Sequence, residues 1–129
     1  MSEPIVFISH FHVKEGRLDA LKDLARAVTE RIELEKPRTL LYLSYIDEAG
    51  GTVSFLHAFA DADSMDLHFE GADQRSAAAY ELVEPAGWEV YGNPSEAAID
   101  SLRGAAANSG VTITEQRDHA AGFHRLARD

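Results

Sequence analysis

The apolar residues of segment 4–92 switch repeatedly between a period of two and a helical period, and this alternation constrains the fold most. Residues 4–14, 39–48 and 52–60 alternate apolar and polar side chains and are rich in β-branched and aromatic types, which predicts strands. Residues 17–36 instead place Leu, Val and Ile at helical spacing among charged residues, which predicts an amphipathic helix.

The segments that follow repeat the strand–helix–strand pattern. A Gly-Gly pair supplies a hairpin turn between the second and third strands. A second helix is predicted over residues 64–83, irregular near Gly71, with Pro85 and Gly87 ending it. Residues 88–92, WEVYG, then give a short fourth strand.

The resulting order, β-α-β-β-α-β, indicates a ferredoxin-like α+β sandwich with both helices on one face of an antiparallel sheet. On the opposite face we expect Val6, Ile8, Tyr42 and Ile46 to form an apolar surface. Because a broad apolar sheet face usually marks an interface, the sequence predicts a homodimer that packs sheet against sheet.

Residues 93–129 follow this core. Ser95 and Gly110 are start and stop signals for a short helix, and residues 111–117 alternate as a strand does. No flexible linker separates this segment from the core, so residues 1–129 are expected to form a single domain. We expect the C-terminal appendage to be able to reach a partner subunit.

Composition excludes several classes of function. Twelve Lys and Arg against 22 Asp and Glu give a formal net charge of -10, which disfavours nucleic acid and anionic membranes as partners. The absence of cysteine excludes disulfides, thiolate metal sites and a cysteine nucleophile. The N-terminus lacks the features of a secretory signal, and no apolar run is long enough to cross a bilayer, so a cytoplasmic location is expected.

Four features between Pro37 and His68 recur in a known pattern. A helix ends near Pro37, a strand carries Leu40–Tyr42, an apolar strand ends in Phe59–Asp61, and a His stands seven residues beyond that Asp. This arrangement resembles the antibiotic biosynthesis monooxygenase family of the dimeric α+β barrel superfamily. The resemblance covers residues 4–92.

The chain departs from that family at specific positions. His57 stands where many relatives have a Glu on the third strand. In the haem-degrading branch, the Trp and the iron-binding His correspond to His68 and Ala78 here, and the strand-one Asn corresponds to Ser9. Without an imidazole at position 78, haem degradation is not expected.

The resemblance implies a cavity between sheet and helices that binds a flat phenol, quinol or polyketide. Some members of the family oxidise such a ligand with molecular oxygen and without a cofactor, so the resemblance implies this activity as one alternative. A deprotonated, desolvated phenolate can reduce oxygen itself, so the protein need supply only a base, a shape and a dry pocket.

His57 and His68 are the candidate catalytic residues. His57 shares a strand face with Phe55 and Phe59, where an imidazole among aromatic walls could act as a general base. The structural alternative is a buried neutral histidine bonded to a backbone carbonyl. His68 matches the family's His, which can pack or cap as well as react.

The candidate substrate-binding residues are aromatic. They are Phe11, Phe55, Phe59, Tyr80 and Trp88. Tyr80, on the second helix, could donate a hydrogen bond to a ligand oxygen. The alternative is that these side chains only fill the core of a small α+β domain.

His10 and His12 lie two residues apart on one strand face, a spacing that sets two imidazoles side by side. Two histidines can begin a metal site, but no third ligand stands at a diagnostic spacing. By parity they face away from the helices, so structural or interface roles are favoured and no metal is expected.

These observations lead to one main hypothesis and two alternatives. The main hypothesis is a homodimeric, cofactor-independent monooxygenase that acts on an aromatic, quinol or polyketide-like molecule. The first alternative is a non-catalytic ligand-binding or accessory protein on the same fold. The second is a metal-dependent enzyme that uses His10 and His12.

Overall fold

The computed structural model describes residues 3–125. The elements along the chain are β1 (Ile5–Val13), α1 (Leu18–Glu35), β2 (Thr39–Asp47), β3 (Thr52–Phe59), α2 (Ala62–Phe69), α3 (Ala72–Ala79), β4 (Val83–Tyr91), α4 (Glu96–Ser109) and β5 (Ile113–Gln116).

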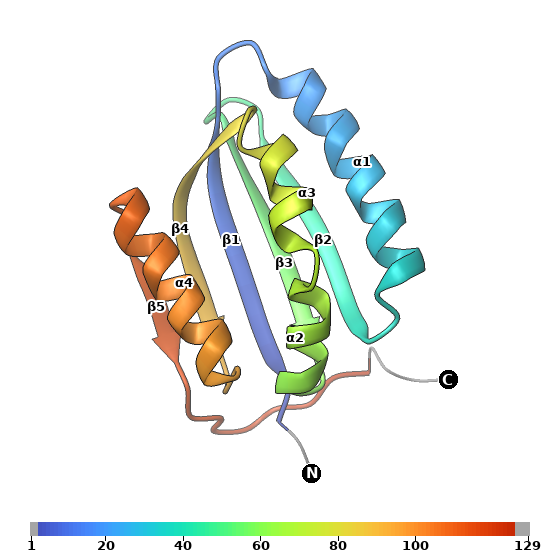
Figure 1. Cartoon of the computed structure of the whole chain (residues 1–129), viewed down its shortest axis with the longest axis vertical. Coiled ribbons are helices and arrows are strands. Elements are labelled where there is room, and N and C mark those ends of the chain that lie inside the picture. Colours follow the sequence, from blue (N-terminus) through green and yellow to red (C-terminus); the bar gives the residue numbers. More distant parts are fainter. Residues whose placement is uncertain (1–2, 126–129) are drawn as a thin grey trace.

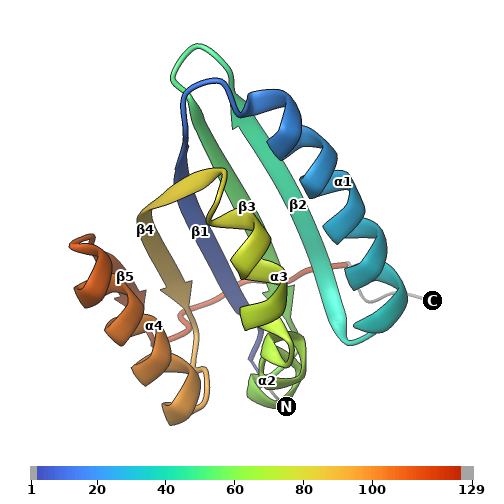
Figure 2. The same cartoon turned by 45° about the horizontal axis from the view of Figure 1, so that its top comes forward.

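The strands form one sheet in the order β2-β3-β1-β4-β5. The first four are antiparallel to their neighbours, whereas β5 lies parallel to β4. All four helices cover the same face of the sheet (Figure 1). The turned view separates α1 over the β2 side from α4 over the β5 side, with α2 and α3 between them (Figure 2). The predicted ferredoxin-like α+β sandwich with a C-terminal helix and strand is confirmed.

Two apolar clusters fill the space between sheet and helices. The larger joins the sheet to α2 and α4 and includes Phe7, Phe59, Met65, Trp88 and Ile99. The smaller lies toward the other end of the strands. It contains Phe11, Leu21, Val53 and Val83. Odd-numbered residues of β1 thus point toward the helices, as their alternation predicts.

The predicted orientation of β2 is wrong. Tyr42 is paired with His57, and Ile46 with Val53, so both side chains lie on the helix-covered face. The open face of β2 instead carries the alternate residues Leu41, Leu43 and Tyr45. The hairpin decides this, because pairing of Asp47 with Thr52 across a four-residue loop fixes every cross-strand partner.

The second helix and the fourth strand also differ from expectation. The predicted irregularity at Gly71 is a complete break, since Gly71 adopts a left-handed φ of 80° between α2 and α3. β4 begins at Val83 rather than at 88, and Pro85 and Gly87 lie within it. Pro85 is tolerated because β5 pairs only with residues 88–91 and a register shift lies opposite it in β1.

The C-terminal appendage packs on its own chain. Ser95 caps α4 by accepting a hydrogen bond from the Ala98 amide, and Gly110 ends the helix in a left-handed conformation. Ile99 and Leu102 of α4 join the larger cluster, which ties this helix to β4. Contact of the appendage with a partner subunit stays a prediction. The segment after β5 crosses the lower end of the sheet toward β2 (Figures 1 and 2).

The face of the sheet opposite the helices is partly apolar. Val6, Leu43 and Tyr45 are 38%, 41% and 60% exposed there. His10 lies among them on the same face, paired with Ser54 of β3. Within residues 3–125 no helix is long and apolar enough to cross a membrane.

Candidate functional site

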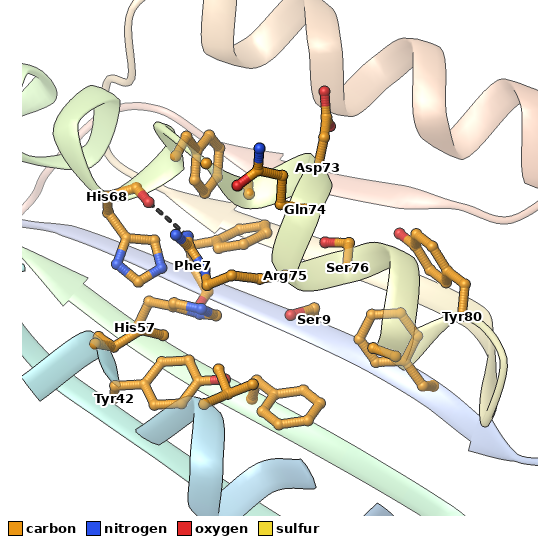
Figure 3. A pocket seen from close by; sticks show the side chains of 18 of the residues that line it. Phe7, Ser9, Tyr42, His57, His68, Asp73, Gln74, Arg75, Ser76 and Tyr80 are labelled. Carbon is orange, nitrogen blue, oxygen red and sulfur yellow. Dashed lines mark hydrogen bonds between the residues drawn. The ribbon is translucent and has the colours of Figure 1, made fainter. Parts of the chain in front are cut away.

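A cavity of about 670 Å³ opens between the sheet and the helices α1 and α3. Its floor consists of side chains from β1, β2, β3 and β4, and α1 and α4 add mostly apolar side chains to its walls. The lining is otherwise aromatic, with a small group of polar residues at the end formed by α2 and α3 (Figure 3). A volume of this size can enclose a small organic molecule of several rings.

His57 lies at the polar end of the cavity floor and is only 5% exposed. Its Nδ1 is 3.1 Å from the backbone oxygen of Phe7. Because a carbonyl can only accept, Nδ1 carries the proton and Nε2 has the free lone pair. The Phe7 and Tyr42 rings lie against the imidazole, with centroids 4.9 and 5.0 Å away.

Burial lowers the pKa of His57 to about 4, although hydrogen bonding to the backbone of Phe7 and Phe55 opposes the shift. The charge of Arg75 lowers it further. His57 is therefore neutral at physiological pH. It can accept a proton, but as a weak base.

His68 lies in the last turn of α2, above His57. The two ring centroids are 5.0 Å apart with the planes at 82°. Nδ1 of His68 is 2.8 Å from the hydroxyl oxygen of Thr39. Burial lowers the pKa of His68 to about 3, assisted by repulsion from His57 and Arg75. The site thus contains two uncharged imidazoles that meet edge to face.

Tyr42 occupies the cavity floor beside His57 (Figure 3). Its ring stacks on Phe55 with centroids 6.0 Å apart. Burial raises the pKa of Tyr42 to about 12, while the charge of Arg75 lowers it in part. The phenol is therefore protonated at neutral pH and can act as a hydrogen-bond donor, not as a base.

Arg75 is the cation that reaches into this end of the cavity. Its Nη2 donates to the backbone oxygen of His68 at 2.6 Å, and its Nη1 to that of Glu70 at 3.1 Å. These two carbonyls end α2, where helical partners are missing. Arg75 thereby holds the α2–α3 junction and sets a positive charge near His57.

Four of the five predicted substrate-binding residues line the cavity. Phe11, Phe55, Tyr80 and Trp88 belong to its walls, together with the two predicted catalytic histidines. Phe11 lies edge-on to Phe55, Tyr80 and Trp88, with centroids between 5.9 and 6.4 Å away. Phe59 is different: it has no exposed surface and stands behind the histidines in the core.

His10 and His12 lie on the opposite face of the sheet. His10 has both nitrogens engaged, Nδ1 with the Ser54 hydroxyl at 2.7 Å and Nε2 with the carboxylate of Glu89. Within residues 3–125 no group of three or more His, Asp or Glu side chains converges as a metal site would require.

Tyr42 and Arg75 are the site residues that sequence reasoning missed. The alternation of β2 alone predicts the wrong face for Tyr42, whereas counting pairs outward from a four-residue hairpin loop places it opposite His57. Arg75 carries no comparable signal. It reaches the cavity only because Gly71 turns the chain between the two short helices.

Comparison with solved structures identifies the fold. No protein-family model matches the sequence, and no curated protein matches it. MupZ from Pseudomonas fluorescens is similar over 93% of this chain and 95% of its own, with a TM-score of 0.68 and 20% identity. The match to Rv0793 from Mycobacterium tuberculosis covers 74% of this chain and 99% of that one, with a TM-score of 0.60 and 21% identity.

A third structure carries a description of activity. A Caulobacter crescentus protein described as a "putative antibiotic biosynthesis monooxygenase" matches over 69% of this chain and 88% of its own, with a TM-score of 0.61 and 15% identity. Further structures with the same description come from other bacteria. The chain therefore has the fold of the antibiotic biosynthesis monooxygenase-like proteins, as the pattern from Pro37 to His68 predicted.

Proposed function

We propose that the cavity binds a flat aromatic molecule such as a phenol, quinol or polyketide and that the protein oxidises it with molecular oxygen, without a cofactor. The observation that supports this is His57, whose free Nε2 belongs to a buried imidazole on the floor of an aromatic-lined cavity. The fold shared with proteins described as monooxygenases agrees with it.

In the proposed reaction Nε2 of His57 takes the proton from a hydroxyl of the ligand. The resulting anion passes one electron to oxygen, and the radical pair recombines to form a carbon–oxygen bond. The His57 imidazolium returns its proton to the terminal peroxide oxygen, which gives a hydroperoxide. The hydroperoxide then loses water and leaves a quinone. One oxygen atom enters the product and the other leaves as water, so all electrons come from the ligand and no external reductant is needed.

The low pKa of His57 limits which ligands can react. Proton transfer from an ordinary phenol, whose pKa is about 10, to a base of pKa about 4 is uphill by roughly 8 kcal/mol. Such a cost still permits turnover, but any interaction that stabilises the ligand anion in the cavity reduces it directly. The site therefore favours ligands that are more acidic than phenol itself.

The second candidate is a non-catalytic ligand-binding or accessory protein. The hydrogen bond from His57 to the Phe7 carbonyl favours this candidate. A buried neutral histidine with a purely structural role also needs a hydrogen-bond partner of this kind. The cavity is open in either case, so binding does not separate the two candidates. Oxygen consumption does.

The test is oxygen uptake on a panel of quinols and anthrones, with quinone formation followed in parallel. His57→Ala is expected to lower turnover by at least about a hundredfold, the usual worth of a general base, with a smaller loss for His68→Ala. His124→Ala is the matched control, because His124 is exposed in the segment after β5, outside the cavity lining. Turnover unchanged in both cavity variants would disprove the mechanism, and binding without any oxygen uptake would support the second candidate.

We also propose that two copies associate through the open sheet face. Val6, Leu43 and Tyr45 expose large apolar side chains there, next to Ile8 and Leu56. An uncovered apolar sheet face of this kind is typical of an interface. In such a dimer each copy keeps its helix-covered face, and hence its cavity, free for a ligand.

A further inference from the structure

Arg75 differs from most arginines within residues 3–125, because it forms no ion pair. Five of them, Arg26, Arg31, Arg38, Arg103 and Arg117, form ion pairs with carboxylates. No ion pair within residues 3–125 includes Arg75. With 22 acidic residues against 12 basic ones, a half-buried guanidinium without a carboxylate partner needs an explanation.

The hydrogen bonds of Arg75 leave part of the guanidinium unused. It donates to the backbone oxygens of His68 and Glu70, which engages two of its five N–H groups. The side chain runs along the cavity between His68 and His57 (Figure 3). Because Arg75 lines the cavity, its remaining N–H groups are the ones that a ligand could use.

The charge of Arg75 acts on three titratable side chains that line the cavity. It lowers the pKa of Tyr42, His57 and His68, so it stabilises negative charge and disfavours positive charge at this end of the cavity. Burial in turn lowers the pKa of Arg75 itself, and among the surrounding ionisable side chains Arg31 adds to this whereas Tyr42 and Glu35 oppose it.

The acidic residue of the lining lies elsewhere. Burial raises the pKa of Tyr80, and the negative charge of Asp73 raises it further. The carboxylate of Asp73 therefore belongs to the end of the cavity that Tyr80 lines. In the close view Asp73 points away from the histidines, whereas Arg75 points toward them (Figure 3). The cavity is therefore polarised, with its positive charge beside the imidazoles.

We propose that Arg75 binds an ionised oxygen of the ligand, so that the substrate class is aromatic acids: molecules whose rings fill the cavity and which carry a carboxylate or an acidic enol or phenol. This rests on the proposed function. Arg75 supplies the missing electrostatic stabilisation that the weak base His57 requires, because the planar guanidinium fork matches oxyanion geometry. It is a binding residue that also determines specificity.

The test compares two probes of the same shape. 2-Naphthoate carries a charged carboxylate and 2-naphthamide a neutral amide, and the affinity of each is measured by calorimetry at neutral pH. We expect the native protein to bind the carboxylate at least about tenfold more tightly, equal to ~1.4 kcal/mol. Arg75→Met should abolish that preference, and Arg75→Lys should retain part of it.

The control is Arg26→Met, which removes the same charge from an exposed position on α1 and should leave the preference unchanged. Since Arg75→Met also removes the two bonds to the α2–α3 junction, its near-ultraviolet circular dichroism is compared with that of the native protein. The ratio of the two affinities in the native protein still tests the proposal if the Arg75→Met variant does not fold.

Three results of these binding measurements would contradict the proposals. Equal affinity for both probes in the native protein would overturn the role of Arg75 while leaving the aromatic cavity intact. A folded Arg75→Met variant that keeps the preference would also overturn it. If the native protein bound neither probe, the proposed ligand-binding function itself would fail.

Discussion

The imidazoles of His57 and His68 meet edge to face, with centroids 5.0 Å apart and planes at 82°. The first comes from β3 and the second from the last turn of α2. Neither ring carries a charge at neutral pH, because burial disfavours the imidazolium in both and each charged ring would repel the other. We expect this pair to make the fold sensitive to acid.

We expect the free energy of unfolding to fall as the pH drops from 6.5 toward 4. In this range unfolded histidines take up protons, whereas His57, with a pKa of about 4, stays neutral in the fold. The loss attributable to His57 is on the order of 3 kcal/mol, since each pKa unit corresponds to about 1.4 kcal/mol. Urea unfolding at a series of pH values measures it.

The control for this experiment is His57→Gln, which retains a hydrogen-bond donor for the Phe7 carbonyl but does not titrate. Its stability should depend less steeply on pH over the same window. An identical slope in the native protein and in His57→Gln would contradict the assignment of the acid sensitivity to His57.

Tyr42 should titrate well above an ordinary tyrosine. Because burial raises its pKa to about 12, its absorbance change should come late in an alkaline titration of the folded protein. Tyr42→Phe should remove that late step and leave the rest of the titration curve unchanged. Loss of an early step instead would show that Tyr42 is not buried as described.

Gly71→Ala should destabilise the protein by about 1–2 kcal/mol, because Gly71 holds a φ of 80° that L side chains rarely adopt. Gly104→Ala is the matched control. Gly104 lies inside α4 with no atom within 4 Å of an added Cβ, so this change should stabilise the protein by about 0.5–1 kcal/mol. Thermal unfolding of both variants provides the comparison, and equal effects would argue against a left-handed Gly71.

Leu43→Glu should weaken self-association. Leu43 is 41% exposed on the proposed interface, and a carboxylate there would be buried without a partner in a dimer. Leu34→Glu makes the same change at a position on α1 that is 83% exposed, away from the open sheet face. Sedimentation velocity should show a dimer for the native protein and for Leu34→Glu, and a shift toward monomer for Leu43→Glu. A native protein that sediments as a monomer would refute the interface.

Local signals predicted most of the elements. The alternation over residues 4–14 and 52–60 places Phe11, Phe55 and His57 on one side of the sheet, and the structure agrees. Ser95 and Gly110 bound α4 as expected, because capping depends on only a few adjacent residues.

Local signals mislead where residues distant in the sequence determine the structure. Pro85 reads locally as a breaker, yet β4 includes it because β5 leaves that stretch unpaired on one side. Tyr42 and Tyr45 are both plausible on either face of an isolated strand. The register with β3 alone assigns Tyr42 to the cavity.

The sequence by itself determined the order of strands and helices, the ends of α4 and the shared face of Phe55 and His57, because each depends on periodicity or on neighbouring residues. The tertiary structure alone decided that Tyr42 and Arg75 meet the two histidines. Their meeting depends on hairpin register and on the left-handed turn at Gly71, which bring together side chains from separate elements. The periodicity of each element taken alone does not set these positions.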